Sequence, residues 1–136
     1  MIPIRTILHP TDLSEQSKAA FQFACALARD YQARLILLTV YSPLSTAENA
    51  TDRERQQEIE EGLLSKLRGL KTDPVVSVMY RVEAGRPADV ILAAAKDCDL
   101  IVMATYGQSG PHHLVMGSVT DAVNRGAACP VVSVRG

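Results

Sequence analysis

Short apolar runs alternate regularly with longer amphipathic stretches along this chain, and this pattern limits the folds that it can adopt. The clearest run, 35–41 (Leu-Ile-Leu-Leu-Thr-Val-Tyr), is almost wholly apolar, which is typical of a strand covered on both faces. Further strands are predicted at Ile4 to His9, Val75 to Val82, Leu100 to Ala104 and Val131 to Val134. Strands that alternate with helices favour a parallel sheet with right-handed crossovers.

Each interval between two predicted strands carries a signal for the start of a helix. These signals are Ser14 as a cap, Thr51 and Glu54 with the spacing of a capping box, Pro87 at a first helical position after Gly85, and Gly117 with Ser118. We expect the first helix to end near Asp30 and the fourth to end at Gly126.

These elements predict one domain over residues 1–136, a doubly wound α/β fold with helices on both faces of a five-stranded parallel sheet of order 3-2-1-4-5. In this order the last strand, Val131 to Val134, lies at an edge and has one neighbour. Exposed strand edges pair readily with other chains. We therefore expect a homodimer formed through the last strand.

Composition and charge exclude several classes of partner. The 14 basic and 15 acidic residues are spread without blocks and give a net charge of -1, so nucleic acid is not an expected partner. No apolar run approaches the roughly 20 residues of a membrane span, and the start lacks the pattern of an export signal. Cys25, Cys98 and Cys129 form neither a chelating pair nor a closed disulfide framework. We expect a cytoplasmic protein with reduced thiols.

In an open doubly wound sheet, ligands bind at the carboxyl ends of the strands, where the winding changes direction. Here that place lies between the segment Pro10-Thr11-Asp12 and the loop from Thr105 to Ser118. A helix that starts at Gly117 and Ser118 would offer unpaired amides to a phosphate. The simpler interpretation is that the glycines turn the chain and the serine caps a helix. A P-loop and a Gly-x-Gly-x-x-Gly fingerprint are both absent.

Four ordered segments resemble the universal stress protein family. They are 7–15 (Ile-Leu-His-Pro-Thr-Asp-Leu-Ser-Glu), 85–91 (Gly-Arg-Pro-Ala-Asp-Val-Ile), 98–107 (Cys-Asp-Leu-Ile-Val-Met-Ala-Thr-Tyr-Gly), and Gly117-Ser118-Val119-Thr120 followed by 128–135 (Ala-Cys-Pro-Val-Val-Ser-Val-Arg). The resemblance spans nearly the whole chain. It implies a Rossmann-like sheet of the adenine nucleotide alpha hydrolase-like kind, a cytoplasmic stress-response role, and dimers that pair their last strands antiparallel.

The resemblance also implies an ATP site, or a site for a related adenine nucleotide. Its contacts would come from Pro10, Thr11, Asp12, Val40, Met103, Ala104, Gly107, Gln108, Ser109, Gly117, Ser118, Val119 and Thr120. Asp12 would lie near the ribose or phosphates, where it could also bind Mg²⁺, and the backbone of Val40 would read the adenine edge. For Asp12 an Asx turn is an equally good interpretation, and both roles can hold.

One position departs from the nucleotide-binding pattern of the family. That pattern is Gly-x-x-Gly, nine residues, then Gly-Ser or Gly-Thr, and this chain has Ala104 at the first glycine. Alanine is the smallest replacement, so we expect binding to persist. The alternative is a dimeric interaction protein of the same family that binds no nucleotide.

An enzyme is the third interpretation, and the sequence favours it least. The loops show no evident base and no lysine clamp, so at most very slow ATP hydrolysis is expected. His9 is expected to be a packed or hydrogen-bonded side chain at a strand end. His112 and His113 lack the helical spacing that lets two imidazoles share a zinc ion.

Overall fold

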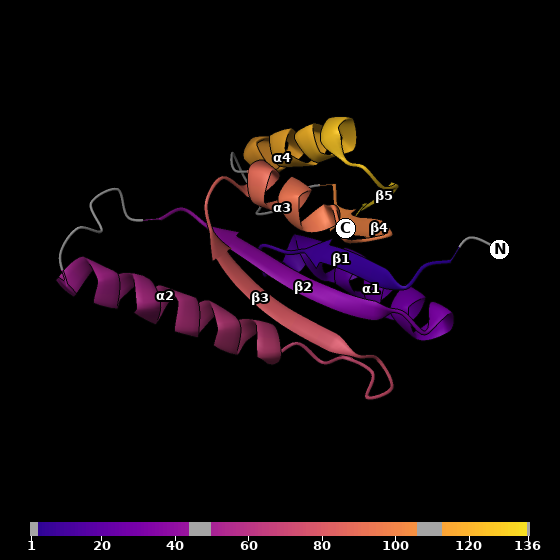
Figure 1. Ribbon diagram of the computed structural model, residues 1–136, viewed down its shortest axis with the longest axis horizontal. Helices are drawn as coiled ribbons and strands as arrows, with labels where there is room; N and C mark the ends of the chain where they lie inside the picture. Colours follow the sequence, from indigo (N-terminus) through magenta and orange to yellow (C-terminus); the bar gives the residue numbers. More distant parts are fainter. Residues whose placement is uncertain (1–2, 44–49, 106–112, 136) are drawn as a thin grey trace.

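The computed structural model describes residues 3–43, 50–105 and 113–135, and within α4 it describes no side chain before Ser118. Its strands are β1 (Thr6–Pro10), β2 (Arg34–Tyr41), β3 (Val78–Ala84), β4 (Leu100–Ala104) and β5 (Val131–Val134). They form one parallel sheet in the order β3-β2-β1-β4-β5. The predicted fold class and strand order are confirmed, and β5 lies at an edge as expected (Figure 1).

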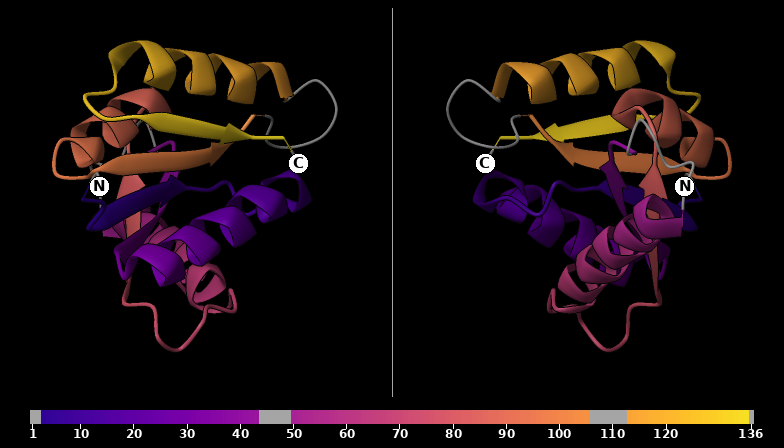
Figure 2. Two further views of the ribbon diagram at one scale, coloured as in Figure 1. Left: turned by 90° about the vertical axis from the view of Figure 1, so that its right-hand side faces the viewer. Right: turned by 90° about the vertical axis from the view of Figure 1, so that its left-hand side faces the viewer.

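The helices cover both faces of this sheet. The short 3₁₀ helix η1 (Glu15–Ser17) leads into α1 (Lys18–Tyr31), which lies with α2 (Ala50–Arg68) on one face. The helices α3 (Pro87–Ala95) and α4 (His113–Gly126) cover the other face (Figure 2). In the described ranges no helix has the length and apolar character needed to cross a bilayer.

Small residues let the first helix approach the sheet closely. Ala20, Ala24 and Ala28 of α1 are buried at a spacing of four residues, so they form one stripe against the sheet. Leu35 and Leu37 of β2 pack into the same layer of the core. Because α1 presents alanines here, its backbone comes close to the centre of the sheet, where it packs over β1 and β4.

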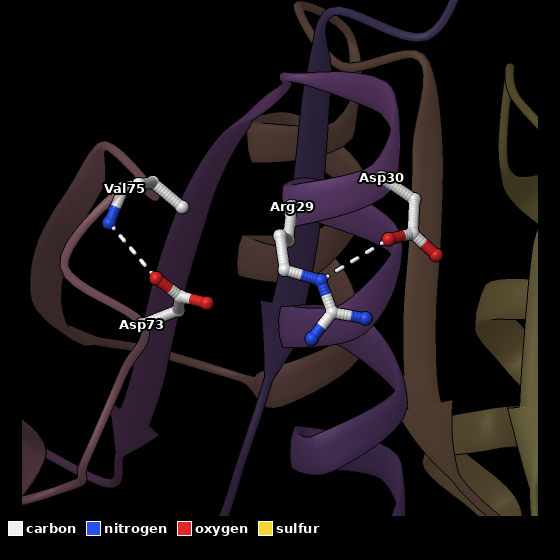
Figure 3. Close-up of polar contacts among 4 residues, drawn as sticks. All are labelled: Arg29, Asp30, Asp73 and Val75. Atoms are coloured by element: carbon white, nitrogen blue, oxygen red, sulfur yellow. Dashed lines mark hydrogen bonds and ion pairs between the residues drawn. The ribbon is translucent and has the colours of Figure 1, made fainter.

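Two predicted boundaries of β3 are wrong. The strand begins at Val78 rather than Val75 and continues to Ala84. The Asp73 carboxylate accepts a hydrogen bond from the Val75 amide at 3.0 Å, and the Asp73 carbonyl accepts one from Val76, so the chain turns here (Figure 3). This Asp73 turn leaves Val75 77% exposed, so this apolar residue lies outside the sheet. Figure 3 also shows the ion pair between Arg29 and Asp30 near the end of α1.

Two predicted helix caps also differ. The helix α2 already includes Ala50, so Thr51 lies within it and cannot be its cap. Ser14 does precede η1, but its side chain forms no capping bond to that helix. Its hydroxyl donates instead to Asp12. By contrast, Pro87 occupies the predicted first turn of α3, and α4 ends at Gly126 as expected.

Gly85 joins β3 to α3 in a backbone conformation that requires glycine. Its φ is 146°, and a Cβ atom there would lie 2.8 Å from Val90 Cγ2. We expect Gly85→Ala to lower the free energy of unfolding by more than about 1 kcal/mol. Gly62→Ala is the matched control, because Gly62 lies within α2 with open space around it, and this change should stabilise by about 0.5–1 kcal/mol. Urea unfolding of both variants measures the two changes in the free energy of unfolding. Equal changes would show that the backbone conformation at Gly85 does not require glycine.

Candidate functional site

The strands β1 and β4 separate at their carboxyl ends. Their paired residues end at Leu8 with Ile101, whereas β1 remains paired to β2 as far as Pro10 with Leu38. The Thr11 amide continues toward β2 by donating to the Leu38 carbonyl at 2.8 Å. In this register the next donor from β1 to β4 would be the amide of Pro10, which has no N–H. The sheet therefore opens at the predicted point of reversal.

Two side chains satisfy carbonyls of β4 at this opening. His9 Nδ1 lies 2.7 Å from the Val102 carbonyl, so the neutral ring donates from Nδ1 in place of the missing Pro10 amide. The Thr120 hydroxyl of α4 donates to the Ala104 carbonyl at 3.1 Å. Both side chains are buried. On the side that faces β1, the end of β4 is thus held by side chains, whereas its other side remains paired to β5.

His9 lies wholly inside the protein. Its ring packs near Phe21 of α1, with ring centroids 6.1 Å apart, and Nε2 has no hydrogen-bond partner among the described residues. Burial lowers the pKa of His9 from 6.5 to about 4, although the Val102 carbonyl and the charge of Asp12 act in the opposite direction. The prediction of a packed, hydrogen-bonded histidine is confirmed, and His9 is neutral at pH 7.

The loop after β1 is fixed by short-range hydrogen bonds. One carboxylate oxygen of Asp12 accepts from the Ser14 amide at 3.0 Å and from its hydroxyl at 2.5 Å, so the predicted Asx turn is present. The Thr11 hydroxyl accepts from the Leu13 amide, and Leu13 is held at φ 63°, which is uncommon for a bulky residue. No described residue donates to the other Asp12 oxygen. That oxygen remains available to a ligand.

The backbone of Val40 faces the same opening. Alternate residues of β2 turn toward β1, as the bonds from Arg34 to Arg5 and from Thr11 to Leu38 show. Val40 is the next residue of this set, beyond the last paired position. The Thr11 carbonyl accepts from the Thr39 hydroxyl at 2.9 Å and not from the Val40 amide. Among the described residues no backbone group pairs with Val40 on this side, so one donor and one acceptor are left for a ligand.

Other predicted site residues are placed in the core. Met103 is fully buried against α3 and α4, and Val119 packs against that same layer. Ala104 is 1% exposed and packs on the opposite face, with α1. Ala104 is a regular strand residue without a positive φ, so the backbone conformation at this position does not require glycine. Ala104 therefore lies in ordinary strand geometry, as expected.

The prediction that Gly117 and Ser118 begin the fourth helix is wrong. The helix α4 includes His113, so both residues lie in its second turn, where amides of a regular helix pair with carbonyls four residues earlier. The apolar 114–116 segment extends the helix ahead of the glycine. The Thr120 hydroxyl donates its proton to the Ala104 carbonyl, and its predicted contact to phosphate stays a prediction. Gly107, Gln108 and Ser109 lie outside the described residues.

Among the predicted site residues, Asp12 is the one whose side chain could bind Mg²⁺. Among the described residues no group of three or more His, Cys, Asp or Glu side chains is arranged to hold a metal ion. Mg²⁺ is commonly bound by one or two carboxylates together with waters and substrate phosphates. The free oxygen of Asp12 fits that kind of site, in which nucleotide phosphates would supply further ligands.

Sequence reasoning did not identify the polar side chains that shape the site. Ser14, Ser17 and Thr39 fix the loop after β1, since Ser17 donates to the Ser14 carbonyl at 2.7 Å and lies 3.1 Å from the Thr11 hydroxyl. The signal for Ser14 was its position two residues after Asp12, which is the spacing of an Asx turn. Thr39 stands out as a polar residue within the buried part of β2, between Leu38 and Val40.

Comparisons with known proteins agree on one family. The profile described as "Universal stress protein family" matches residues 3–135. Universal stress protein MJ0531 of Methanocaldococcus jannaschii is 32% identical over 96% of this chain and 82% of its own length. The solved structure of hypothetical protein MJ0577 is 26% identical with a TM-score of 0.86, covering 99% of this chain and 98% of that one. A universal stress protein solved in complex with cAMP is 24% identical with a TM-score of 0.68, over 98% of each chain.

Proposed function

This chain belongs to the universal stress protein family, and we propose that it binds ATP or a related adenine nucleotide where β1 and β4 separate. The observation that carries the proposal is the opening beyond Leu8 and Ile101, at the point where the winding of the sheet reverses. The similar structure in complex with cAMP supports an adenine nucleotide as the ligand class. The protein would act as a cytoplasmic stress-response module whose nucleotide state alters an association or a conformation.

Each part of the nucleotide has a complementary group at the opening. The Val40 carbonyl and amide would accept from the adenine amino group and donate to a ring nitrogen. The free oxygen of Asp12 would accept from a ribose hydroxyl or bind Mg²⁺. The start of α4 follows the loop that leaves β4, and a helix start attracts phosphate. Ala104 supports this proposal over a family member without nucleotide, because its methyl group packs into the α1 layer.

We expect ATP to bind at least tenfold more tightly than AMP. The reason is that the outer phosphates would reach the helix start of α4, whose partial positive charge favours anions. Calorimetric titration of nucleotide-free protein with each nucleotide measures the ratio. Equal affinities would contradict the phosphate-binding role proposed for the start of α4.

The proposal as a whole is tested by denaturing freshly purified protein and identifying any nucleotide released. ATP or ADP in an amount close to that of the protein is expected. If none is released and the folded protein does not bind added ATP, the alternative of a dimeric interaction protein without nucleotide is correct. Hydrolysis is expected to be very slow, because the described loops provide no lysine clamp.

We also propose a homodimer through β5. The Ile101 and Thr105 amides donate to the carbonyls of Pro130 and Val134, so the even-numbered residues of β5 face β4. The backbone groups of Val131 and Ser133 therefore point away from the sheet. This free edge is short and mostly apolar, which suits antiparallel pairing with a second copy.

An exposed aromatic side chain adds apolar surface beside that edge. The helix α1 packs next to β5 (Figure 2). Phe21 lies on the flank of α1 that meets the end of α2, so Phe23, two positions later, lies on the opposite flank. Phe23 is 42% exposed. In the proposed dimer this ring would be covered by the partner.

A further inference from the structure

A separate cavity lies between the start of α1 and the end of α2. Its volume is about 420 Å³, which falls in the range of about 300–1,000 Å³ usual for small-molecule sites. The loop after β1 forms one wall, and the chain that follows α2 forms the other. This position is on the face of the sheet covered by α1 and α2 (Figure 2).

The inner lining of the cavity is apolar. Leu13, Phe21 and Leu70 line it, and each is half-buried against the core layer under α1. The hydroxyl groups at its base are already used, because the Thr11 hydroxyl bonds to Ser17, and Ser17 donates to the Ser14 carbonyl. A ligand here would meet an apolar surface with few free polar groups.

Positive charge dominates the rim. Lys18 of α1 and Lys71 after α2 both line the cavity, against a single carboxylate, Glu15. In the part of the chain that the structure describes, neither lysine forms an ion pair. Two unpaired ammonium groups above an apolar lining complement a molecule with an apolar body and a negative head.

The cavity is distinct from the proposed nucleotide site. Asp12 and Val40 are not among its lining residues, and Val40 packs on the opposite face of the sheet, with α3. The two sites share only the loop that follows β1. Ligand binding in this cavity would therefore be independent of nucleotide binding between β1 and β4.

We propose that this cavity binds a small amphipathic carboxylate, with an acyl chain or ring against Leu13, Phe21 and Leu70 and the carboxylate between Lys18 and Lys71. The anionic head makes two charge-assisted contacts, and the apolar body displaces water from the lining. Neutral molecules of the same shape bind more weakly, because they leave both lysines without a partner.

Octanoate is the probe, and amide chemical shifts of the labelled full chain report where it binds. The expected result is saturable shifts centred on residues 13–18, 21–22 and 69–71, with a dissociation constant below about 1 mM. Octanol should bind at least tenfold more weakly. Shifts scattered over the surface, no shifts up to about 10 mM octanoate, or equal binding of octanol would overturn the proposal.

Charge reversal tests the two lysines against a matched control. Lys18→Glu with Lys71→Glu should weaken octanoate binding at least tenfold, whereas Lys66→Glu with Lys96→Glu, the same change in net charge outside the cavity, should change it less than twofold. Both lysine pairs are exposed, so both variants should fold. Equal weakening in the two double variants would show a nonspecific charge effect and overturn the proposal.

Discussion

Replacing Ser133 by proline is expected to convert the proposed homodimer into monomers while the fold persists. The Ser133 amide points away from β4, so its loss removes no hydrogen bond within the sheet. It removes a donor from the edge that would pair with the second copy, and the proline ring adds a steric clash there. Light scattering at tens of micromolar should report a shift of at least tenfold in the dimer dissociation constant.

Two variants control for other effects of this substitution. Ser133→Ala keeps the amide and changes only an exposed side chain, so it should remain dimeric. Val132→Pro would instead delete a bond to β4, so it destabilises the sheet itself and cannot isolate the interface. A wild type that is monomeric, or a folded Ser133→Pro variant that stays dimeric, would exclude β5 as the interface.

Lowering the pH from about 6.5 to about 4 is expected to cost the protein about 3 kcal/mol of stability through His9 alone. The folded-state pKa of His9, about 4, lies below the ordinary histidine pKa of 6.5, so the unfolded chain binds this proton more tightly. The stabilisation is therefore complete above pH 6.5 and is lost as the pH falls toward 4. The physical cause is burial of the ring, which disfavours the imidazolium.

His9→Gln isolates this contribution. A glutamine amide can still donate to the Val102 carbonyl, but it does not titrate. Urea unfolding of the wild type and the variant at about pH 7 and about pH 4.5 gives the loss of unfolding free energy on acidification for each protein. The carboxylates contribute equally to the two losses. The variant should lose less stability on acidification than the wild type. Equal losses in the two proteins would show that His9 does not remain neutral in the folded state at low pH.

Periodicity predicted the sheet well because buried parallel strands leave a strong apolar signal. The run 35–41 and the segment Leu100–Ala104 are strands within one residue of the predicted bounds. Val75 and Val76 look equally strand-like, yet the Asp73 turn keeps them out of β3. Local side-chain bonds of this kind compete with strand pairing, and apolar spacing alone does not reveal them.

The candidate site was predictable in location but less so in the roles of its residues. Strand order places Asp12 and Ala104 at the point of reversal, because that follows from topology. The part played by Thr120 depends on which carbonyls of β4 lack a partner, and that depends on where the pairing of β4 with β1 ends. Such relations appear only when the register between two strands is known.

Binding of an adenine nucleotide where β1 and β4 separate can be tested by an ATP titration followed through backbone amide chemical shifts. We expect saturable shifts concentrated at Asp12, Val40 and Thr105, at one site per chain. The amides around Lys71, in the separate cavity, should change little. No saturable shifts at millimolar ATP, or shifts that leave Asp12 and Val40 unchanged, would contradict the claim.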